Sequence, residues 1–502
     1  MAEGVIRLHG SDNVVVALKD QPAGAELAEL AVPLPGPVPR GHKIALRAIA
    51  KGEEVVRYGQ IIGQATENIP AGAHVHSHNL GMGPHSSDYA IGSECRPLPA
   101  LEPRTFLGYH RPDGTVGTRN YLGILTSVNC SGSVARFIAE AAEKDPVLAA
   151  AKIDGIVPIV HQTGCGMSAT NEGYQTLMRT LKGYARNPNF GGILLVGLGC
   201  EVMQVPDLVG QGRLRPDGNF RYMTIQGEGG TRATIERALK VLREMAEVAG
   251  QVERAPAPVS KLVVGLQCGG SDGYSGITAN PALGHASDLL VRMGGTTILS
   301  ETPEIYGAEH LLTRRAVSRE VGETLLERIR WWEDYTARNE GEMDNNPSPG
   351  NKRGGLTTIL EKSLGAVAKG GTAPLAGVYK FAEPITTPGF TYMDSPGYDP
   401  CSVTGQIASG ATVIVFTTGR GSVSGYKPSP CIKLATNSEM YGRMKEDMDI
   451  NCGDILDGVS IEAKGEEILE KIIAVASGQQ TLSEELGFGG AEFVPWQIGA
   501  VM

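Results

Sequence analysis

The stretch LVVGLQCGGSDGYSGITANPAL, residues 262–283, decides the fold of the C-terminal half of this chain. It opens with an apolar run of the kind that forms a buried strand in a parallel sheet. Two glycines then turn the chain into a polar loop that holds Cys268, Ser271, Asp272 and Asn280. A buried strand that ends in such a loop is the usual setting of an active site in an open α/β sheet. The alternative is a turn whose Ser and Asp side chains cap a helix.

The composition limits the class of protein. Glycine is frequent, at 67 residues, and aromatic residues make up 5%, which indicates many tight turns between compact elements. The formal net charge is -10 without a long basic run, so nucleic acid is not an expected partner. The sequence shows no apolar stretch of about 18 residues and no signal peptide, so we expect a cytoplasmic protein without a membrane span. Eight cysteines in 502 residues predict thiols, metal ligands or small core residues, not a disulfide scaffold.

Residues 5–82 read as a small all-β unit of short apolar runs separated by glycines. Within it, the motif HVHSHN places His74, His76 and His78 at alternate positions. In an extended strand these three imidazoles share one face, where they suit zinc or iron or contact a carboxylate. The alternative is a solvated edge strand without a ligand.

The rest of the chain changes character. Residues 84–104 contain four prolines and predict a stiff linker. Strand-like runs then alternate with helical patterns through residues 105–250 and, after a short linker, through residues 258–502, which predicts mostly parallel sheets. The fold class is therefore multidomain, with a small N-terminal all-β domain followed by α/β domains with Rossmann-like sheets. The clearest strands are expected at 121–128, 153–160, 192–198, 296–300 and 412–416, and the clearest helices at 134–144, 231–249, 314–339 and 466–477.

Four cysteines follow apolar runs. Cys130, Cys165 and Cys200 are separated by a constant step of 35 residues, and Cys268 repeats the arrangement. The carboxyl ends of parallel strands lie at one edge of a sheet, so these thiols can converge. Thiolates suit iron or zinc, and three cysteines around an iron–sulfur cluster leave one iron open for substrate. The alternative is that each cysteine is a small core residue.

Two further loops carry cations. NPSPGNKRGG, residues 346–355, holds Lys352 and Arg353 among glycines, and FTTGRG holds Arg420 after a strand. Arginine on such a loop is a natural bidentate clamp for a carboxylate. The alternative for each loop is a helix-capping turn with surface charges.

These motifs together resemble the altronate/galactarate dehydratase family, and the resemblance spans nearly the whole chain. HVHSHN is similar to the altronate branch, which we favour, whereas HASDLLVR and LLTRRAV are similar to the galactarate branch. The motifs that carry the resemblance, besides the N-terminal module, are GYHRPDGTVGTRN (108–120), VGLGCE (196–201), QCGGSDGYSGITANP (267–281), NPSPGNKRGG (346–355) and FTTGRG (416–421).

The resemblance implies an organisation and a cofactor. It implies a β-clip (SAF-like) domain at residues 1–83, a middle domain at 105–250 that contributes to a homodimer, and a Rossmann-like domain at 258–502. It also implies a divalent metal, usually iron. Together with the thiols, this makes Fe²⁺ or an iron–sulfur cluster the expected cofactor, with Mn²⁺ or another divalent cation as the alternative. The expected reaction removes water from an aldonate or aldarate such as D-altronate and gives a 2-keto-3-deoxy acid.

That reaction needs particular groups. Removal of the hydrogen beside the carboxylate needs a base and a cation that stabilises the enediolate, and the neighbouring hydroxyl needs a proton or a metal to leave. We expect catalytic roles for His74, His76, His161, Asp272 and Lys352, substrate contacts for His78, Ser271, Asn280, Asn351, Arg353 and Arg420, and metal binding by Cys130, Cys165, Cys200 and Cys268.

Three other functions stay open at this stage. The chain can be a galactarate dehydratase, or a related lyase on another small hydroxy acid, such as a sulfo-lyase. A sugar-acid binding protein without catalysis is the alternative from a different class, and it predicts binding without turnover.

Overall fold

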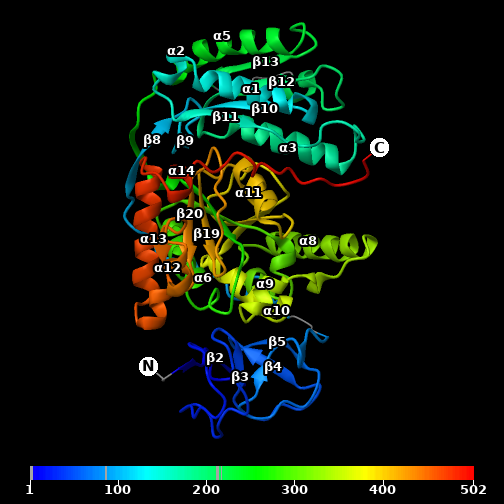
Figure 1. Cartoon of the computed structure of the whole chain (residues 1–502), viewed down its shortest axis with the longest axis vertical. Coiled ribbons are helices and arrows are strands. Elements are labelled where there is room, and N and C mark those ends of the chain that lie inside the picture. Colours follow the sequence, from blue (N-terminus) through cyan, green and yellow to red (C-terminus); the bar gives the residue numbers. More distant parts are fainter. Residues whose placement is uncertain (1–3, 85–87, 211–213, 216, 502) are drawn as a thin grey trace.

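The structure is a computed structural model that describes residues 4–84, 88–210, 214–215 and 217–501. Figure 1 shows three bodies along the long axis, with the N-terminal β domain at the bottom, the C-terminal α/β domain in the centre and the middle α/β domain at the top. The predicted class is confirmed, since an antiparallel β domain precedes two domains with parallel sheets. Residues 85–87 of the predicted linker lie outside the described part.

The N-terminal domain consists of two small antiparallel sheets, and one prediction made for it is wrong. His74, His76 and His78 do not share a strand face, because the strand ends at Val75 and the chain then turns. The Asn79 side chain makes that turn by accepting from the His76 N–H and donating to the His74 carbonyl, at 2.9 and 3.0 Å. The strands are β1 (Val5–Ile6), β2 (Val14–Ala17), β3 (Lys43–Ala45) and β6 (His74–Val75) in one sheet, and β4 (Glu54–Arg57), β5 (Gln60–Ala65) and β7 (Leu80–Gly81) in the other.

The C-terminal domain is built on a seven-stranded, all-parallel sheet in the order β17-β18-β16-β15-β19-β20-β21. The chain winds from β15 towards β16 on one side and later returns to β19 on the other, so the carboxyl end of β15 is the topological switch point where ligands bind in such sheets. The strands are β15 (Val263–Cys268), β16 (Thr296–Leu299), β17 (Leu375–Tyr379), β18 (Gly389–Met393), β19 (Val413–Thr418), β20 (Cys431–Ala435) and β21 (Ile450–Asn451).

Helices cover both faces of this sheet. α6 (Ala279–Arg292) and α13 (Ile461–Ala476) pack together on one face, and α11 (Asp399–Ala408) covers the other. Two of the predicted helices begin elsewhere than expected, because serine side chains cap them. Ser318 starts α8 (Arg319–Arg338) and Ser460 starts α13, each by accepting from a main-chain N–H of the first turn.

The middle domain has a four-stranded parallel sheet in the order β11-β10-β12-β13. α1 and α5 pack on one face, while α3 lies on the other and also contacts α11 of the C-terminal domain. The elements are β10 (Tyr121–Thr126), β11 (Gly155–Ile159), β12 (Phe190–Gly197), β13 (Phe220–Thr224), α1 (Gly132–Glu143), α3 (Glu172–Arg186) and α5 (Thr231–Ala249).

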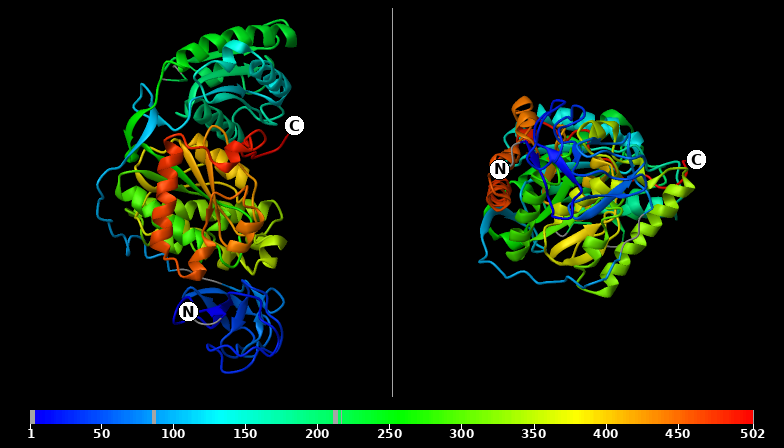
Figure 2. Two further views of the ribbon diagram at one scale, coloured as in Figure 1. Left: turned by 60° about the vertical axis from the view of Figure 1, so that its left-hand side comes forward. Right: turned by 90° about the horizontal axis from the view of Figure 1, so that it is seen from below.

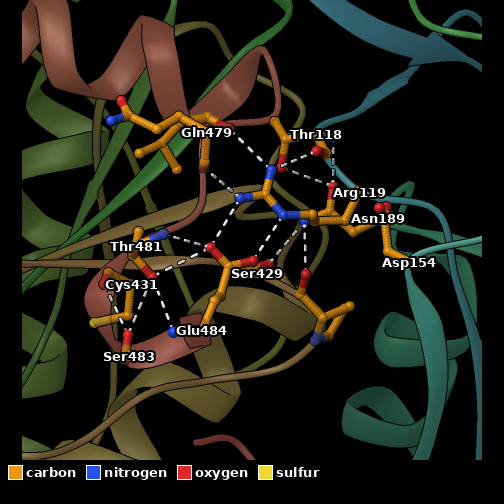
Figure 3. A network of polar contacts seen from close by, with 12 residues as sticks. Thr118, Arg119, Asp154, Asn189, Ser429, Cys431, Gln479, Thr481, Ser483 and Glu484 are labelled. Carbon is orange, nitrogen blue, oxygen red and sulfur yellow. Dashed lines mark hydrogen bonds and ion pairs between the residues drawn. The ribbon is translucent and has the colours of Figure 1, made fainter. Parts of the chain in front are cut away.

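A buried ion pair joins the middle and C-terminal domains (Figure 3). Arg119, just before β10, pairs with Glu484 at 2.7 Å and donates to the carbonyls of Val475 and Gln479 at 2.8 and 2.9 Å. The guanidinium is 3% exposed, and each of its nitrogens is satisfied. This fully bonded cation fixes the start of the middle sheet against the end of the chain.

The linker and the C-terminal tail add further contacts between the bodies. In Figure 2 the linker runs along the outside of the C-terminal domain, where Leu101 donates to the Arg292 carbonyl at 2.9 Å. The C-terminal tail crosses between the middle and C-terminal domains, with Phe493 against Tyr184 and Trp496 stacked on Trp332. Within the described residues, no helix combines the length and apolar character that crossing a membrane requires.

Candidate functional site

Five ionisable side chains meet at the carboxyl ends of β15 and β16, and we call them the edge cluster: Cys268, Glu301, Glu304, Lys362 and Lys369. The ligand atoms of Cys268, Glu301 and Glu304 all lie within 4.8 Å of one another. Lys369 Nζ is 2.7 Å from the Cys268 sulfur, and Lys362 donates to Glu304 at 2.6 Å. All five are buried, at 7% exposure or less.

Local structure explains how the edge cluster is assembled. Cys268 is the last residue of β15, and Glu301 follows β16 in a left-handed conformation with φ 74° that costs a non-glycine residue energy. Ser395 accepts the Glu301 main-chain N–H at 3.0 Å and holds this turn. Glu304 ends the short 3-10 turn that follows, while Lys362 comes from α10 (Ile359–Val367) and Lys369 from the turn after it.

Burial sets the protonation of the edge cluster. Burial raises the pKa of the Cys268 thiol to about 11, so the thiol stays protonated beside the Lys369 ammonium at neutral pH. Burial, reinforced by the neighbouring Glu304 carboxylate, raises the pKa of Glu301 well above its usual range. Burial also opposes the charge on Lys369, but the nearby Cys268 and Glu301 raise its pKa overall. The cluster therefore combines proton donors with two ammonium groups.

The donor set fits a divalent first-row metal ion. A thiol and two carboxylates combine a soft ligand with hard oxygen ligands, as iron and manganese accept. Glu301 Oε1 is buried and has no hydrogen-bond partner among the described residues, so one oxygen is free for a cation. The Lys369 ammonium donates to the sulfur that such an ion would bind. Metal binding therefore competes with this hydrogen bond and displaces the thiol proton.

The glycine-rich loop after β15 is held by hydrogen bonds of its own. Asp272 accepts from the side chains of Ser275, Thr436 and Asn437 at 3.0 to 3.1 Å, so its carboxylate ties this loop to the end of β20. Asn280 donates to the Gly365 carbonyl at 2.8 Å and is likewise engaged. Asp272 and Asn280 therefore fix the conformation of the loop after β15.

Four histidines gather where the N-terminal domain meets the C-terminal domain. His42 Nδ1 lies 3.0 Å from His74 Nε2, and the His42 ring stacks on His76 with centroids 4.7 Å apart. His78 is exposed and its ring lies 5.4 Å from that of His74. Burial first, then neighbouring charges, lower the pKa of His42 to about 4 and that of His74 to about 3, so both rings are neutral at neutral pH.

The hydrogen bonds fix the histidine tautomers. His76 Nε2 lies 2.8 Å from the Lys352 carbonyl, and His42 Nε2 lies 3.2 Å from the Arg353 carbonyl. Because a carbonyl only accepts, both Nε2 atoms carry protons, and the neutral His42 then accepts at Nδ1 from His74. The main chain of the predicted cationic loop thus orients the histidines, while the Lys352 side chain is half-buried and that of Arg353 is exposed.

A buried charge triad fixes this domain interface. Lys43 and Arg57 of the N-terminal domain both pair with Glu361 of α10, with Lys43 at 2.9 Å. Burial by itself raises a carboxyl pKa, yet the two cations lower that of Glu361 to about 2. A cavity of about 10 Å³ lies beside the triad and is lined by Cys268, Lys362 and Tyr58 among others, which is room for about one water molecule.

The predicted convergence of four thiols is wrong. Cys268 belongs to the seven-stranded sheet of the C-terminal domain, whereas Cys130, Cys165 and Cys200 follow β10, β11 and β12 of the middle sheet. Those three are exposed, and Cys268 is buried. The 35-residue spacing links cysteines that follow strands of the middle sheet only. The apolar run before Cys268 is β15, which belongs to the C-terminal domain.

The remaining predicted residues are dispersed. His161 is buried with both ring nitrogens engaged, Nε2 by the Thr126 carbonyl at 3.0 Å and Nδ1 by the Thr163 N–H at 3.3 Å. Asn351 completes a capping box with Ser348 at the start of α9 (Pro349–Arg353) and donates to the Ser271 carbonyl at 2.8 Å. The Arg420 side chain is exposed beside the glycine-rich loop, and the Arg420 main-chain N–H donates to the Gly270 carbonyl at 2.8 Å.

Sequence reasoning missed most of the edge cluster and one histidine. Glu301 and Glu304 stand in SETPE directly after a predicted strand, a signal of the same kind as the loop after β15. Lys369 and His42 carried no such signal, because their neighbours come from distant parts of the chain.

Known proteins match this chain over nearly its full length. Family models match residues 259–501 (D-galactarate/Altronate dehydratase, C-terminal), 108–250 (D-galactarate dehydratase/Altronate hydrolase, second domain) and 3–83 (Altronate/galactarate dehydratase SAF domain). The chain is 39% identical to a galactarate dehydratase (L-threo-forming) of Escherichia coli, over 96% of this chain and 94% of the relative. It is 36% identical to an altronate dehydratase of Bacillus subtilis, over 96% and 97%. A (2R)-sulfolactate sulfo-lyase subunit beta of Chromohalobacter salexigens is 32% identical, over 77% and 96%.

The fold, the edge cluster and these similarities define a hydro-lyase that acts on a sugar acid. The chain belongs to the altronate/galactarate dehydratase family, with an SAF domain at its N-terminus. The predicted enzyme class is thereby confirmed, and the reading as a binding protein without catalysis is set aside.

Proposed function

We propose that this protein removes water from a six-carbon aldonate or aldarate, with D-altronate as the first substrate and galactarate as the alternative, to give a 2-keto-3-deoxy acid. The observation that carries the proposal is the edge cluster, which places buried acids and ammonium groups at the carboxyl ends of β15 and β16. The relatives named as altronate and galactarate dehydratases, at 36 to 39% identity, support the same reaction class.

The chemistry assigns a role to each charge. Burial raises the pKa of Glu301 and favours its protonated form, so a cation that binds this carboxyl releases a proton that can go to the leaving hydroxyl. Lys362 and Lys369 are ammonium groups that stabilise the negative charge of the enediolate. His74, whose lowered pKa keeps it neutral, is a base for the hydrogen beside the substrate carboxylate.

A divalent cation completes the proposal. Cys268, Glu301 and Glu304 are the residues that would hold it, and iron is the metal we propose, with Mn²⁺ as the alternative. When bound, such an ion polarises a substrate hydroxyl or carboxylate oxygen as a Lewis acid.

The substrate carboxylate needs cations outside the edge cluster. Lys352, Arg353 and Arg420 carry side chains that are half-buried or exposed beside the histidines and the glycine-rich loop, and we assign them to carboxylate binding. Hydroxyl groups of the substrate would meet His76 and His78, while Ser271, Asp272, Asn280 and Asn351 hold the loops beside them through their hydrogen bonds. The proposal includes a cytoplasmic homodimer formed through the middle domain, which light scattering of the purified protein would test.

A keto-acid assay decides the substrate. The protein is purified anaerobically and given D-altronate, galactarate and (2R)-sulfolactate, with Fe²⁺, with Mn²⁺ or after chelation. We expect product from altronate or galactarate, more of it with Fe²⁺, and no sulfite from sulfolactate. Turnover of sulfolactate alone, or of none of the three, would overturn the proposal.

A further inference from the structure

The middle-domain sheet brings three cysteine-bearing loops to the same edge. β10 lies between β11 and β12, and Thr126 of β10 pairs with Val196 of β12. Cys130 and Cys200 each stand four residues beyond that pair. Cys165 stands six residues beyond Ile159, the partner of Leu125. Adjacent strands are about 4.8 Å apart, so three neighbouring strand ends span roughly 10 Å.

The three cysteine loops are bonded to one another. The Asn129 N–H donates to the Thr163 carbonyl at 2.9 Å, and the Met203 N–H donates to the Gly164 carbonyl at 3.0 Å. Ser127 also donates to Glu201 at 2.5 Å, which ties the end of β10 to the loop after β12. The loops that carry Cys130, Cys165 and Cys200 therefore form one connected rim.

Glycine geometry holds the Cys165 loop against β10. Cys165 stands between Gly164 and Gly166, which have φ of 98° and 64°. A Cβ at Gly164 would lie 2.2 Å from the Ser127 carbonyl oxygen, so only glycine permits this close approach. The sequence around Cys165 thus favours one position of its loop.

The exposure of these thiols is unusual. Free cysteine is among the most buried residue types, and Cys268, Cys401, Cys431 and Cys452 follow that rule here. Cys130, Cys165 and Cys200 are exposed instead, although each follows a strand of the parallel sheet. Three thiols presented to solvent on one bonded rim indicate a ligand that they share.

The spacing favours a cluster over a single ion. Zinc–sulfur bonds of about 2.3 Å require thiolates that nearly touch. In the described part of the chain, Cys268, Glu301 and Glu304 are the one group of three such ligands whose atoms all lie within 4.8 Å of one another, so at least one pair among the three exposed thiols stands farther apart than that. Gln226 Nε2 lies 3.3 Å from the Cys200 sulfur, and hydrogen bonds to sulfur are among the features that tune iron–sulfur clusters.

We propose that Cys130, Cys165 and Cys200 hold a [4Fe–4S] cluster in the middle domain, separate from the edge cluster. Each thiol loses its proton and binds one iron, and the fourth iron keeps no ligand from these cysteines. His161 does not supply one, because both of its ring nitrogens are bonded within the loop. The cluster goes beyond the proposed dehydratase function and does not depend on it.

The test measures iron and sulfide on the full-length protein. The protein is reconstituted anaerobically with Fe²⁺ and sulfide and desalted, and bound iron, acid-labile sulfide and the EPR spectrum after reduction are recorded. We expect about four sulfides per chain. Cys130→Ser, Cys165→Ser and Cys200→Ser should each lose most of the sulfide, while Cys95→Ser, a half-buried thiol of the linker, should keep it.

Several outcomes would overturn the cluster. They are a wild-type protein without labile sulfide, a triple serine variant that retains as much as the wild type, and a single ion bound by the thiols without sulfide. Circular dichroism and urea unfolding confirm that the variants are folded. A reconstituted wild-type protein that holds no labile sulfide yet turns over a sugar acid would remove the cluster and leave the dehydratase intact, whereas a cluster without turnover of any sugar acid would do the reverse.

Discussion

Cys268 ends β15 in the C-terminal sheet and Cys200 follows β12 in the middle sheet, yet the first is 2% exposed and the second is open to solvent. The difference comes from what packs on each sheet edge. α10 and the N-terminal domain cover the end of β15, whereas the loops after β10, β11 and β12 bond mainly to one another. Cysteines near the carboxyl ends of two parallel sheets thus acquire opposite chemistry, a protonated thiol among buried charges and a rim of exposed thiols.

The largest effect is expected from removing the Glu304 carboxylate of the edge cluster. Glu304→Gln leaves the Lys362 ammonium buried without its carboxylate, which typically costs about 3–5 kcal/mol, and it also removes a proposed metal ligand. We expect turnover to fall to background and the urea midpoint, followed by tryptophan fluorescence, to drop clearly. Glu470→Gln breaks the exposed pair with Arg104 and should change the free energy of unfolding by less than about 1 kcal/mol. Equal midpoints for the two variants would show that the edge cluster is not a tightly paired buried site.

The pH dependence of stability tests how strongly burial shifts the pKa of a carboxyl group near the edge cluster, that of Asp399. Burial first, then the neighbouring Glu304, raises the pKa of Asp399 to about 7, so the folded state holds this proton between about pH 4 and pH 7 while the unfolded state releases it. Its stabilising contribution is therefore complete below about pH 4 and is lost as the pH rises through 7. Unfolding midpoints measured across this range should fall more steeply for wild type than for Asp399→Asn. Parallel curves would mean that Asp399 ionises as easily in the folded protein as in the unfolded chain.

A matched pair of cysteine variants compares the two edges directly. Cys268→Ala removes a buried thiol that accepts from Lys369, so we expect a loss of about 1–3 kcal/mol in the free energy of unfolding. Cys165→Ala alters an exposed side chain and should stay within about 0.5 kcal/mol of wild type when no metal is bound. If both variants lose the same stability, the difference in burial has no energetic consequence.

The smallest effect is expected from Gln226→Leu. This change removes the N–H that points at the Cys200 sulfur and leaves all three thiols in place. The sulfide content after reconstitution should match wild type, while the reduction potential of the cluster should fall, because a hydrogen bond to sulfur stabilises the reduced form. An unchanged potential, or a loss of sulfide, would show that Gln226 does not act on the cluster in this way.

The local sequence patterns predicted individual strands better than they predicted which side chains lie together. The apolar runs at 121–128, 192–198 and 412–416 all became strands, because a buried parallel strand needs only a continuous apolar segment. The three-histidine strand failed, because the Asn79 side chain offered the backbone a turn in place of a sheet partner. The cysteine step correctly marked neighbouring strands but extended the pattern to a fourth strand of another domain.

The sequence by itself determined the fold class, the succession of a β domain and two parallel α/β domains, and the loops that follow buried strands, since periodicity and glycine placement are local properties. Only the tertiary structure decided which charges meet. Strand order brought Glu301 beside Cys268. Packing of α10 and the turn after it brought Lys362 to Glu304 and Lys369 to Cys268, across 58 and 101 residues of chain. Burial then set the pKa of each group. Desolvation depends on what covers a site, so residue spacing along the chain cannot encode it.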